Sequence, residues 1–307
     1  MPQILIQLMK GILIGAANVV PGVSGGTIAL LTGIYERLIN AINACNTEAL
    51  ILLRQRKFSQ CWHHIDGLLL FTIGTGVLIS LFSFAKLLDW LFMQHKLYVW
   101  SFFFGLILAS VYAVGKTNQK WSVSGGLFFI LGTITAGSMA LLTPATSNDS
   151  TLYLILCGAI AMCSMILPGL SGSFVLLLMG NYELVVNAIS QLNLKTLVPF
   201  GVGALLGIIL FARLLSWIFH RYHDQTISLL TGFIFGSLTL LWPWKSEITQ
   251  MVVNGNELKE KVIGYTYTLP ISNLETYISI GLIMMGILIL FWTENASKAT
   301  AAKNKLR

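Results

Sequence analysis

Charge is scarce in this sequence, and acidic charge most of all. Only 10% of the 307 residues are charged, with 12 Asp and Glu against 19 Lys and Arg, while 55% are hydrophobic. A soluble domain of this length could not bury so much apolar surface, so a soluble protein is excluded and an integral membrane protein is predicted. The mean hydropathy of +0.77 agrees with this assignment.

Cysteine is also scarce, and the basic excess has no pattern. The cysteines, Cys45, Cys61, Cys157 and Cys163, lack metal-ligand or disulfide-framework spacing, so we assign them no metal or redox role and expect no cofactor. The net charge of +7 is spread over loops and the tail, without the basic, aromatic-rich face that would suggest a nucleic-acid partner. The first apolar run carries no small-residue cleavage motif, so we expect no signal peptide.

Proline is the third scarce residue, with seven in the chain, yet it recurs in one motif. The sequence "PGVSGG" covers Pro21–Gly26 and "PGLSGS" covers Pro168–Ser173, each inside an apolar stretch and each followed by Gly-x-Tyr-Glu. Shifting residues 11–42 by 147 positions gives thirteen identities in 32. A shift of 127 positions aligns 85–92 with 212–219. Such duplication predicts a transporter fold built from two structural repeats.

The apolar runs define the predicted topology. Six of them are near the ~20 residues that a spanning helix needs, namely 66–92, 98–115, 123–143, 197–219, 227–244 and 274–293. The interrupted segments, 4–44 and 152–190, fit re-entrant hairpins that return to the side they entered. With three spans per half, the second repeat is then inverted. The predicted fold class is an all-α polytopic membrane protein with two inverted-topology repeats.

These repeats cover 1–145 and 151–295, and a basic tail covers 296–307. With the N-terminus inside, eleven basic residues lie in the cytoplasm and five outside, as the positive-inside rule requires. If each interrupted segment crossed once instead, Arg54, Arg56 and Lys57 would move outside, so we prefer the hairpins. Both termini are then cytoplasmic, and 245–273 is a long outside loop.

The two breaks carry the predicted binding site. Proline cannot donate a backbone hydrogen bond, glycine permits tight turning, and a serine caps the helix that follows. Two helix N-termini that meet near the membrane midplane would cradle a phosphate or carboxylate group. The alternative is a pair of structural kinks with capping serines. The candidate residues at the breaks are Asn18, Pro21, Gly22, Ser24, Gly25, Gly26, Thr27, Pro168, Gly169, Ser171, Gly172 and Ser173.

Four charged residues near the apolar segments form repeat-related pairs. Glu36 and Glu183 follow the two breaks at equal spacing, and Lys86 matches Arg213. Charge at membrane depth is costly unless it is paired or hydrated, which suggests a function. We predict that Lys86 and Arg213 neutralise an anionic head group and that the glutamates hold these bases or carry protons. The alternative is an interfacial Glu36 and a local Lys86–Asp89 pair.

Two segments resemble a known family. "GAANVVPGVSGGTIALLTGIYERLI" (Gly15–Ile39) and "GAIAMCSMILPGLSGSFVLLLMGNYELV" (Gly158–Val185) look like the signatures of the PopT-type bacterial polyprenyl-phosphate transporters. The resemblance implies that the protein returns undecaprenyl phosphate from the outer to the inner leaflet of the bacterial cytoplasmic membrane, for reuse in cell-envelope synthesis. It also implies that both tip motifs, Glu36 and Glu183 are the functional core. Asn18 departs from the acidic or similar polar residue expected there.

The expected mechanism is transport without covalent chemistry. The head group binds between the hairpins, the isoprenoid tail stays among the membrane lipids, and the two halves rock. The coupling ion is left open between a proton and a sodium ion, and His63, His64, His220 and His223 are read as loop residues. One rival is a membrane polyprenyl-diphosphate phosphatase, whose comparable turn continues with an arginine that is missing here. Another is a carrier for a small soluble anion.

Overall fold

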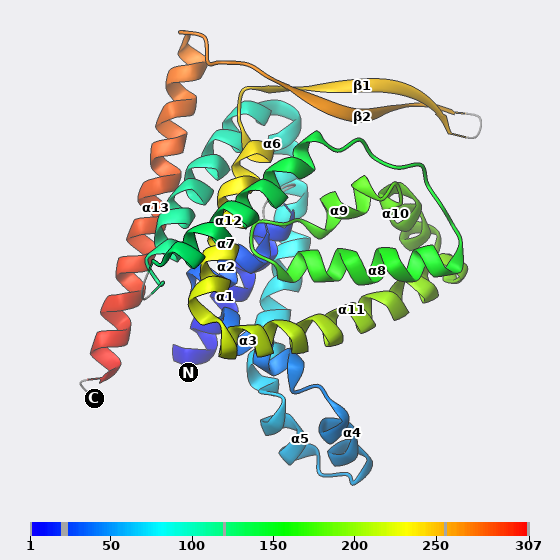
Figure 1. The fold of residues 1–307 in the computed structure, drawn as a ribbon, viewed down its shortest axis with the longest axis vertical. Coiled ribbons are helices and arrows are strands. Elements are labelled where there is room, and N and C mark those ends of the chain that lie inside the picture. Colours follow the sequence, from blue (N-terminus) through cyan, green and yellow to red (C-terminus); the bar gives the residue numbers. More distant parts are fainter. Residues whose placement is uncertain (1, 20–23, 119–120, 255–256, 306–307) are drawn as a thin grey trace.

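The fold is almost entirely helical. The computed structural model describes residues 2–19, 24–118, 121–254 and 257–305 (Figure 1). The first half contains α1 (Pro2–Val19), α2 (Gly25–Leu31), α3 (Tyr35–Asn43), α4 (Thr47–Arg54), α5 (Phe58–His64), α6 (Gly67–Gly115), α7 (Val123–Ser138) and the short 3-10 helix η1 (Met139–Leu141). The second half contains α8 (Thr151–Ile166), α9 (Gly172–Leu178), α10 (Tyr182–Gln191), α11 (Leu194–Arg221), α12 (His223–Leu241), β1 (Lys245–Asn254), β2 (Glu257–Tyr267) and α13 (Leu274–Lys305).

Within the described residues, five helices are long and apolar enough to cross a membrane. They are Trp90–Gly115, Val123–Leu141, Leu194–Arg221, His223–Leu241 and Leu274–Trp292, and the number rises to seven if two bent helix pairs each count as one span. The chain is therefore a multi-span membrane protein. One of the bent pairs, Gly172–Leu178 with Tyr182–Ile189, turns by 116°.

The sequence repeat reappears as a repeat of local structure. Helices α2 and α9 begin at positions 147 apart, as do α3 and α10. The segments that align at a shift of 127 positions also correspond in structure. Helix α6 has a break at His95 (φ −137°, ψ 42°), and the equivalent residue of the second repeat, Tyr222 (φ −136°, ψ 53°), separates α11 from α12. The long helix α6 thus matches α11 and α12 taken together. The predicted spans 66–92 and 98–115 are joined in this one kinked helix.

Helix packing follows the same pairing in both halves. α1 packs along α6, and α8 packs along α11, while α7 and α12 form a close pair and α13 packs on the second part of α6 (Figure 1). Glycines lie at these crossings: a Cβ on Gly11 would be 2.5 Å from the carbonyl oxygen of Ile73 on α6. Gly158, the repeat partner of Gly11, contacts the backbone of α11 in the same way. Small residues let membrane helices approach closely.

The buried core lies between the halves. Ala29 on α2, Ile107 on α6, and Leu230 and Ile234 on α12 each have at most 1% of their surface exposed. In the view of Figure 1, α8 and α11 run side by side across the direction of α6 and α13. The short helix α2 is thus enclosed by both repeats, which brings the first break into the interior.

Two segments expected to be loops have regular structure. The segment predicted as a long outside loop, 245–273, forms an antiparallel ribbon of β1 and β2 at one end of the molecule (Figure 1). Its β-branched and aromatic residues, as in "KVIGYTYT" (261–268), favour strands. The longer loop expected around Arg54 forms α4 and α5 at the opposite end. The residues of the predicted tail continue α13 as far as Lys305.

Candidate functional site

The first break ends in a capped helix N-terminus. Ser24 is extended (φ −109°, ψ 131°), and its Oγ accepts a hydrogen bond from the Gly26 backbone N–H at 3.2 Å. The Gly25 N–H donates to Oδ1 of Asn18, the last polar residue of α1, at 2.8 Å. The backbone N–H groups of Gly25 and Gly26, which we predict from the sequence to bind an anion, therefore already have hydrogen-bond partners within the chain in this conformation. Pro21 and Gly22 lie outside the described residues.

The two breaks lie against each other. The Ser24 hydroxyl donates to the Leu167 carbonyl at 3.0 Å, and the Gly169 N–H donates to Oγ1 of Thr27 at 2.9 Å. The Tyr35 hydroxyl donates to the Ile166 carbonyl at 3.1 Å. The carbonyls of Ile166 and Leu167 need such partners because α8 ends at the break and leaves its last carbonyls without helical donors. Side chains of the first repeat thus satisfy the backbone of the second, and Ser24 and Thr27 are buried while they do so.

The second tip is more open. Ser171 caps α9 in the same extended conformation as Ser24, with its Oγ 3.5 Å from the Phe174 N–H. Its hydroxyl is 2.9 Å from that of Ser173, and Ser173 is exposed. Pro168, Gly169 and Gly172 are buried. The repeat-related tips are therefore unequal, because the first is closed by its own caps and the second presents a pair of hydroxyls.

Close packing explains the backbone shape of the second break. Gly169 has φ +81°, and a Cβ there would lie 2.5 Å from the backbone carbonyl of Phe233 on α12. Glycine is favoured at this position both by the left-handed backbone and by the approach of α12. Gly33 and Gly180, which follow the tips in the two repeats, also share a left-handed conformation (φ +69° and +77°).

The predicted charged residues do not gather at the tips. Glu36 on α3 is 3.1 Å from Nε2 of His223, the first residue of α12. Glu183 on α10 and Arg213 on α11 are exposed, and neither makes an ion pair among the described residues. The side chain of Lys86, like that of Asp89, lies outside the described part of the chain. Of the predicted charged residues whose side chains the structure describes, Glu36 makes a contact between the two halves.

A polar cavity of about 750 Å³ lies beside Glu36. Arg37, on its wall, binds the Asp66 carboxylate through two hydrogen bonds of 2.6 and 3.1 Å. The complete lining is Leu30, Gly33, Tyr35, Glu36, Arg37, Asn40, Ala41, His64, Asp66, Thr117, His223 and Ile227. Residues of both repeats meet here, so the cavity is a second polar junction between the halves.

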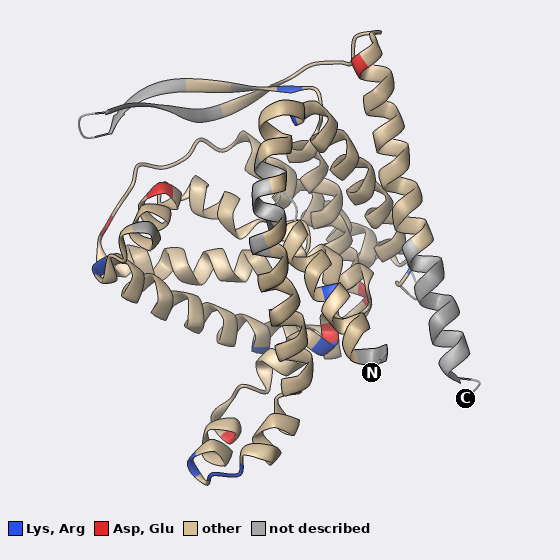
Figure 2. Cartoon of the chain, turned by 180° about the vertical axis from the view of Figure 1, so that it is seen from behind, with Lys and Arg blue, Asp and Glu red and all other residues tan. Residues whose placement is uncertain are grey.

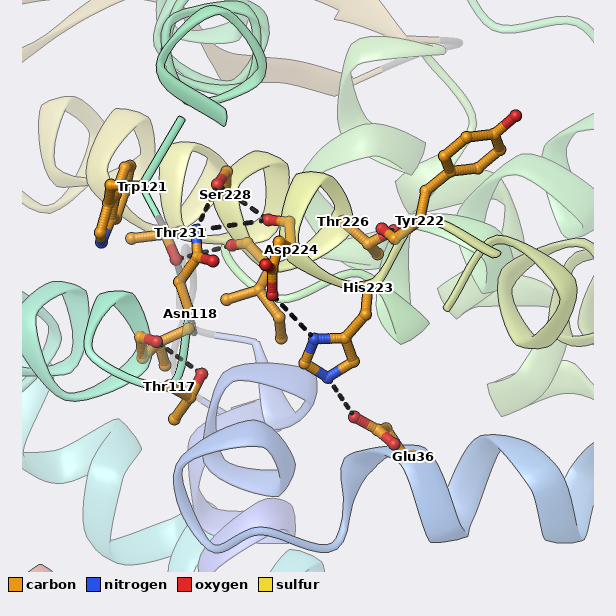
Figure 3. A network of polar contacts seen from close by, with 12 residues as sticks. Glu36, Thr117, Asn118, Trp121, Tyr222, His223, Asp224, Thr226, Ser228 and Thr231 are labelled. Carbon is orange, nitrogen blue, oxygen red and sulfur yellow. Dashed lines mark hydrogen bonds and ion pairs between the residues drawn. The ribbon is translucent and has the colours of Figure 1, made fainter. Parts of the chain in front are cut away.

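The prediction that the four histidines are loop residues is wrong. His63 and His64 end α5, His220 lies in the last turn of α11, and His223 begins α12. His223 joins Glu36 to Asp224, whose Oδ1 is 3.3 Å from Nδ1 (Figure 3). The signal that could have identified His223 is its position immediately after Tyr222, which is equivalent to His95 in the repeat.

A buried amide extends this network to the loop before α7. Nδ2 of Asn118 donates to Oγ of Ser228 at 2.8 Å, and that hydroxyl donates to the carbonyl of Asp224 at 2.9 Å (Figure 3). Oδ1 of Asn118 is buried without a hydrogen-bond partner in the described part of the chain. The start of α12 is therefore held by Glu36 of α3 on one side and by Asn118 on the other.

The side chains around the breaks offer hydroxyls, amides and helix ends. Among the described residues, no group of three His, Cys, Asp or Glu side chains is arranged to hold a metal ion. The tips suit recognition of an oxyanion through hydrogen bonds. At the cavity, the Glu36 carboxylate lies within hydrogen-bond distance of the His223 imidazole.

Comparisons with known proteins place this chain in a family. Residues 14–259 match the VCA0040-like family profile, described as undecaprenyl phosphate translocase-like. A polyprenyl-phosphate transporter of Vibrio cholerae serotype O1 is 41% identical over 253 residues, which cover 82% of each chain. A polyprenyl-phosphate transporter of Staphylococcus aureus is 31% identical over 259 residues, covering 78% of this chain and 86% of the relative. No solved structure matches significantly. With most of its length matched and both signature segments inside the matched region, this chain belongs to the undecaprenyl phosphate translocase-like family.

Proposed function

We propose that this protein moves undecaprenyl phosphate across the bacterial cytoplasmic membrane, from the outer to the inner leaflet, for reuse in cell-envelope synthesis. The family, and two relatives that are polyprenyl-phosphate transporters, support the substrate class. The observation that carries the proposal is the contact between two repeat-related breaks in otherwise apolar helices. Non-helical backbone at membrane depth is tolerated only where protein covers it or where it lines a cavity.

The head group binds at the tips in this proposal. The hydroxyls of half-buried Ser171 and exposed Ser173 offer the first hydrogen bonds. The N–H groups of Gly25 and Gly26 become available when Asn18 and Ser24 turn away. Donors at a helix N-terminus favour an anion. The phosphate would thereby exchange with the side-chain caps that close the first tip in the present conformation.

The two halves move against each other during translocation. In our proposal each half is a re-entrant hairpin with three spans, the halves are inverted, and both termini are cytoplasmic. The hydrogen bonds from Ser24 and Tyr35 to the second break are few and can be exchanged for water or substrate as the halves rock. The isoprenoid tail remains in lipid, so only the head group needs a polar path.

Charge compensation is assigned to the repeat-related basic residues. Lys86 and Arg213 neutralise the phosphate, while Glu36 acts through His223 at the cavity and Glu183 acts at the matching place in the second half. The Glu36–His223 contact supports proton coupling, because a carboxylate and an imidazole 3.1 Å apart can pass a proton between them. Sodium coupling is the alternative, and comparing transport under a proton gradient with transport under a sodium gradient separates them.

The test is leaflet exchange in proteoliposomes that contain a polyprenyl phosphate. A membrane-impermeant phosphatase added outside removes phosphate only from the outer leaflet, so about half of the lipid is protected without exchange. We expect the protein to make nearly all of it accessible. The variant Ser171→Ala/Ser173→Ala should slow the exposure of inner-leaflet lipid to the phosphatase at least tenfold, because it removes both hydroxyls that bind the head group.

A matched control is available in the same chain. Ser122 caps α7, and its hydroxyl is 2.9 Å from that of Ser124, which repeats the arrangement of Ser171 and Ser173 away from the breaks. The variant Ser122→Ala/Ser124→Ala should exchange lipid at the wild-type rate. Equal rates for both double variants would contradict the head-group site.

Two related assays test the rival functions. Sustained release of phosphate from a polyprenyl diphosphate by the protein itself would favour a phosphatase. Uptake of inorganic phosphate into liposomes that lack polyprenyl lipid would favour a carrier for a soluble anion. We expect neither activity.

A further inference from the structure

A helical arm projects from the body of the molecule. We define the arm as residues 46–65, which contain α4, α5 and their connection, and it lies at the end of the molecule opposite the β ribbon (Figures 1 and 2). Helix α5 is bent by 71° from the first turns of α6. If the start of α6 enters the membrane, α5 runs close to the plane of the membrane surface.

Large apolar side chains of the arm are uncovered. Leu50 on α4 is 65% exposed, and Phe58 on α5 is 63% exposed. The small residues Ala49 and Cys61 are instead buried between the two helices, where Sγ of Cys61 is 3.6 Å from the Ala49 carbonyl. The helices therefore pack through small side chains and leave their large apolar side chains outside.

The uncovered surface continues onto α6. Trp62 is 45% exposed, covers Gly67, and lies 6.4 Å from the ring of Phe71, which is 64% exposed on the first turns of α6. Tryptophan is enriched where a membrane helix meets the head-group region. The apolar face of the arm thus joins the exposed apolar face of a helix that begins in the same place.

The tip of the arm is basic. Arg54, Arg56 and Lys57 are exposed and adjacent at the connection of α4 and α5 (Figure 2). Glu48 is the acidic residue of the arm. An amphipathic element with basic residues beside Trp, Phe and Leu is suited to an anionic bilayer surface, where each basic residue adds to binding.

We propose that the arm binds the surface of an anionic bilayer. Phe58, Trp62 and Leu50 enter the boundary between head groups and acyl chains, and the three basic residues bind lipid phosphates. The charge at the tip and the continuity with α6 favour lipid over a second copy of the chain as the occupant. This role is independent of the lipid that the protein transports, and it anchors the end of the molecule from which α6 begins.

The test is hydrogen–deuterium exchange of the full chain in nanodiscs. Phosphatidylcholine discs are compared with discs that also contain phosphatidylglycerol. We expect amides of residues 47–64 to exchange at least fivefold more slowly in the anionic discs. The variant R54Q/R56Q/K57Q should abolish this difference, because each basic residue contributes about fivefold to occupancy. Screening by 1 M salt should reduce it in the wild type.

Two controls keep the result interpretable. The variant K116Q/K195Q/R221Q removes the same charge from other exposed positions and should retain the protection. The variant L50S/F58S changes only exposed side chains and should weaken protection in both kinds of disc. Equal exchange of the wild-type arm in both discs would overturn the proposal. Protection that requires two protein copies per disc would also overturn it, in favour of self-association.

Discussion

Thr27 illustrates how one buried hydroxyl joins the halves of this protein. It has no exposed surface, and its Oγ1 accepts the N–H of Gly169, 142 residues away. The buried hydroxyl of Thr231 instead bonds within its own helix, to the Ile227 carbonyl. The same residue type therefore has a local role in α12 and a tertiary role in α2.

We expect Thr27→Val to destabilise the protein by about 1–3 kcal/mol, because the buried Gly169 N–H loses its acceptor. Thr231→Val, a substitution of the same size at a position that is 1% exposed, should have a smaller effect. Thermal unfolding in detergent measures both variants. Equal shifts in the two variants would show that the contact between the breaks contributes little.

Glu36 and Glu183 differ although the repeat relates them. Side chains of Glu36 and His223 are 54% and 39% exposed, so their pair should contribute less than ~1 kcal/mol to stability. In translocation assays we expect Glu36→Gln and His223→Asn to be non-additive when combined, since each removes the same interaction. Glu183→Gln and His223→Asn should combine additively. Additive effects in the first pair would separate Glu36 from His223 functionally.

At the scale of elements, glycine spacing sets how closely the helices approach. Gly76 on α6 and its repeat partner Gly203 on α11 contact the backbones of α1 and α8, whereas Gly74 and Gly201, two residues earlier, have open space where a Cβ would lie. Helices α6 and α11 therefore each pack closely through the face that carries Gly76 or Gly203. The paired arrangement in both halves is a property of the repeat, not of a single helix.

Gly76→Ala and Gly203→Ala should each separate a helix pair and destabilise the protein by about 1–3 kcal/mol. Gly74→Ala and Gly201→Ala place the same methyl group in open space and should be neutral, or stabilising by up to ~1 kcal/mol, because alanine is the better helix former. Unfolding temperatures of the four variants provide the comparison. A loss of stability at Gly74 or Gly201 matching that at Gly76 and Gly203 would contradict the packing argument.

At the scale of the whole molecule, the central issue is whether the interrupted segments return or cross. The arm and the β ribbon lie at opposite ends of the long axis (Figure 1). With hairpins, the arm is cytoplasmic and the connection 142–150 is outside. With single crossings, both assignments reverse, while residues 192–193 stay outside in either case.

Single cysteines at Ser59 and Ser147, both exposed, decide between these topologies. We expect an impermeant maleimide added to intact cells to label Ser147→Cys, and to label Ser59→Cys only after permeabilisation. The native cysteines must first be replaced, although partial burial and the neighbouring Cys61 raise the pKa of the Cys45 thiol and slow its reaction. Labelling of Ser59→Cys in intact cells would refute the hairpin topology.

Much of the local structure follows from sequence. Helices α2 and α9 begin directly after Ser24 and Ser171, as the capping pattern predicts. The arm and the ribbon were missed because their short segments carry weak periodicity, although "VVNGNEL" (252–258) contains the Asn-Gly signal of a hairpin turn. Glu36 stays a predicted site residue, and its contact with His223 does not follow from the sequence pattern.

The sequence by itself determined the membrane environment, the duplication and the places where helices break. These properties depend on composition, on similarity along the chain and on local backbone chemistry. Only the tertiary structure decided that Ser24 reaches Leu167, that Asn18 closes the first tip, and that Glu36 meets His223. The physical reason is that apolar helix faces are chemically alike, so close packing and a few distant hydrogen bonds select which faces meet.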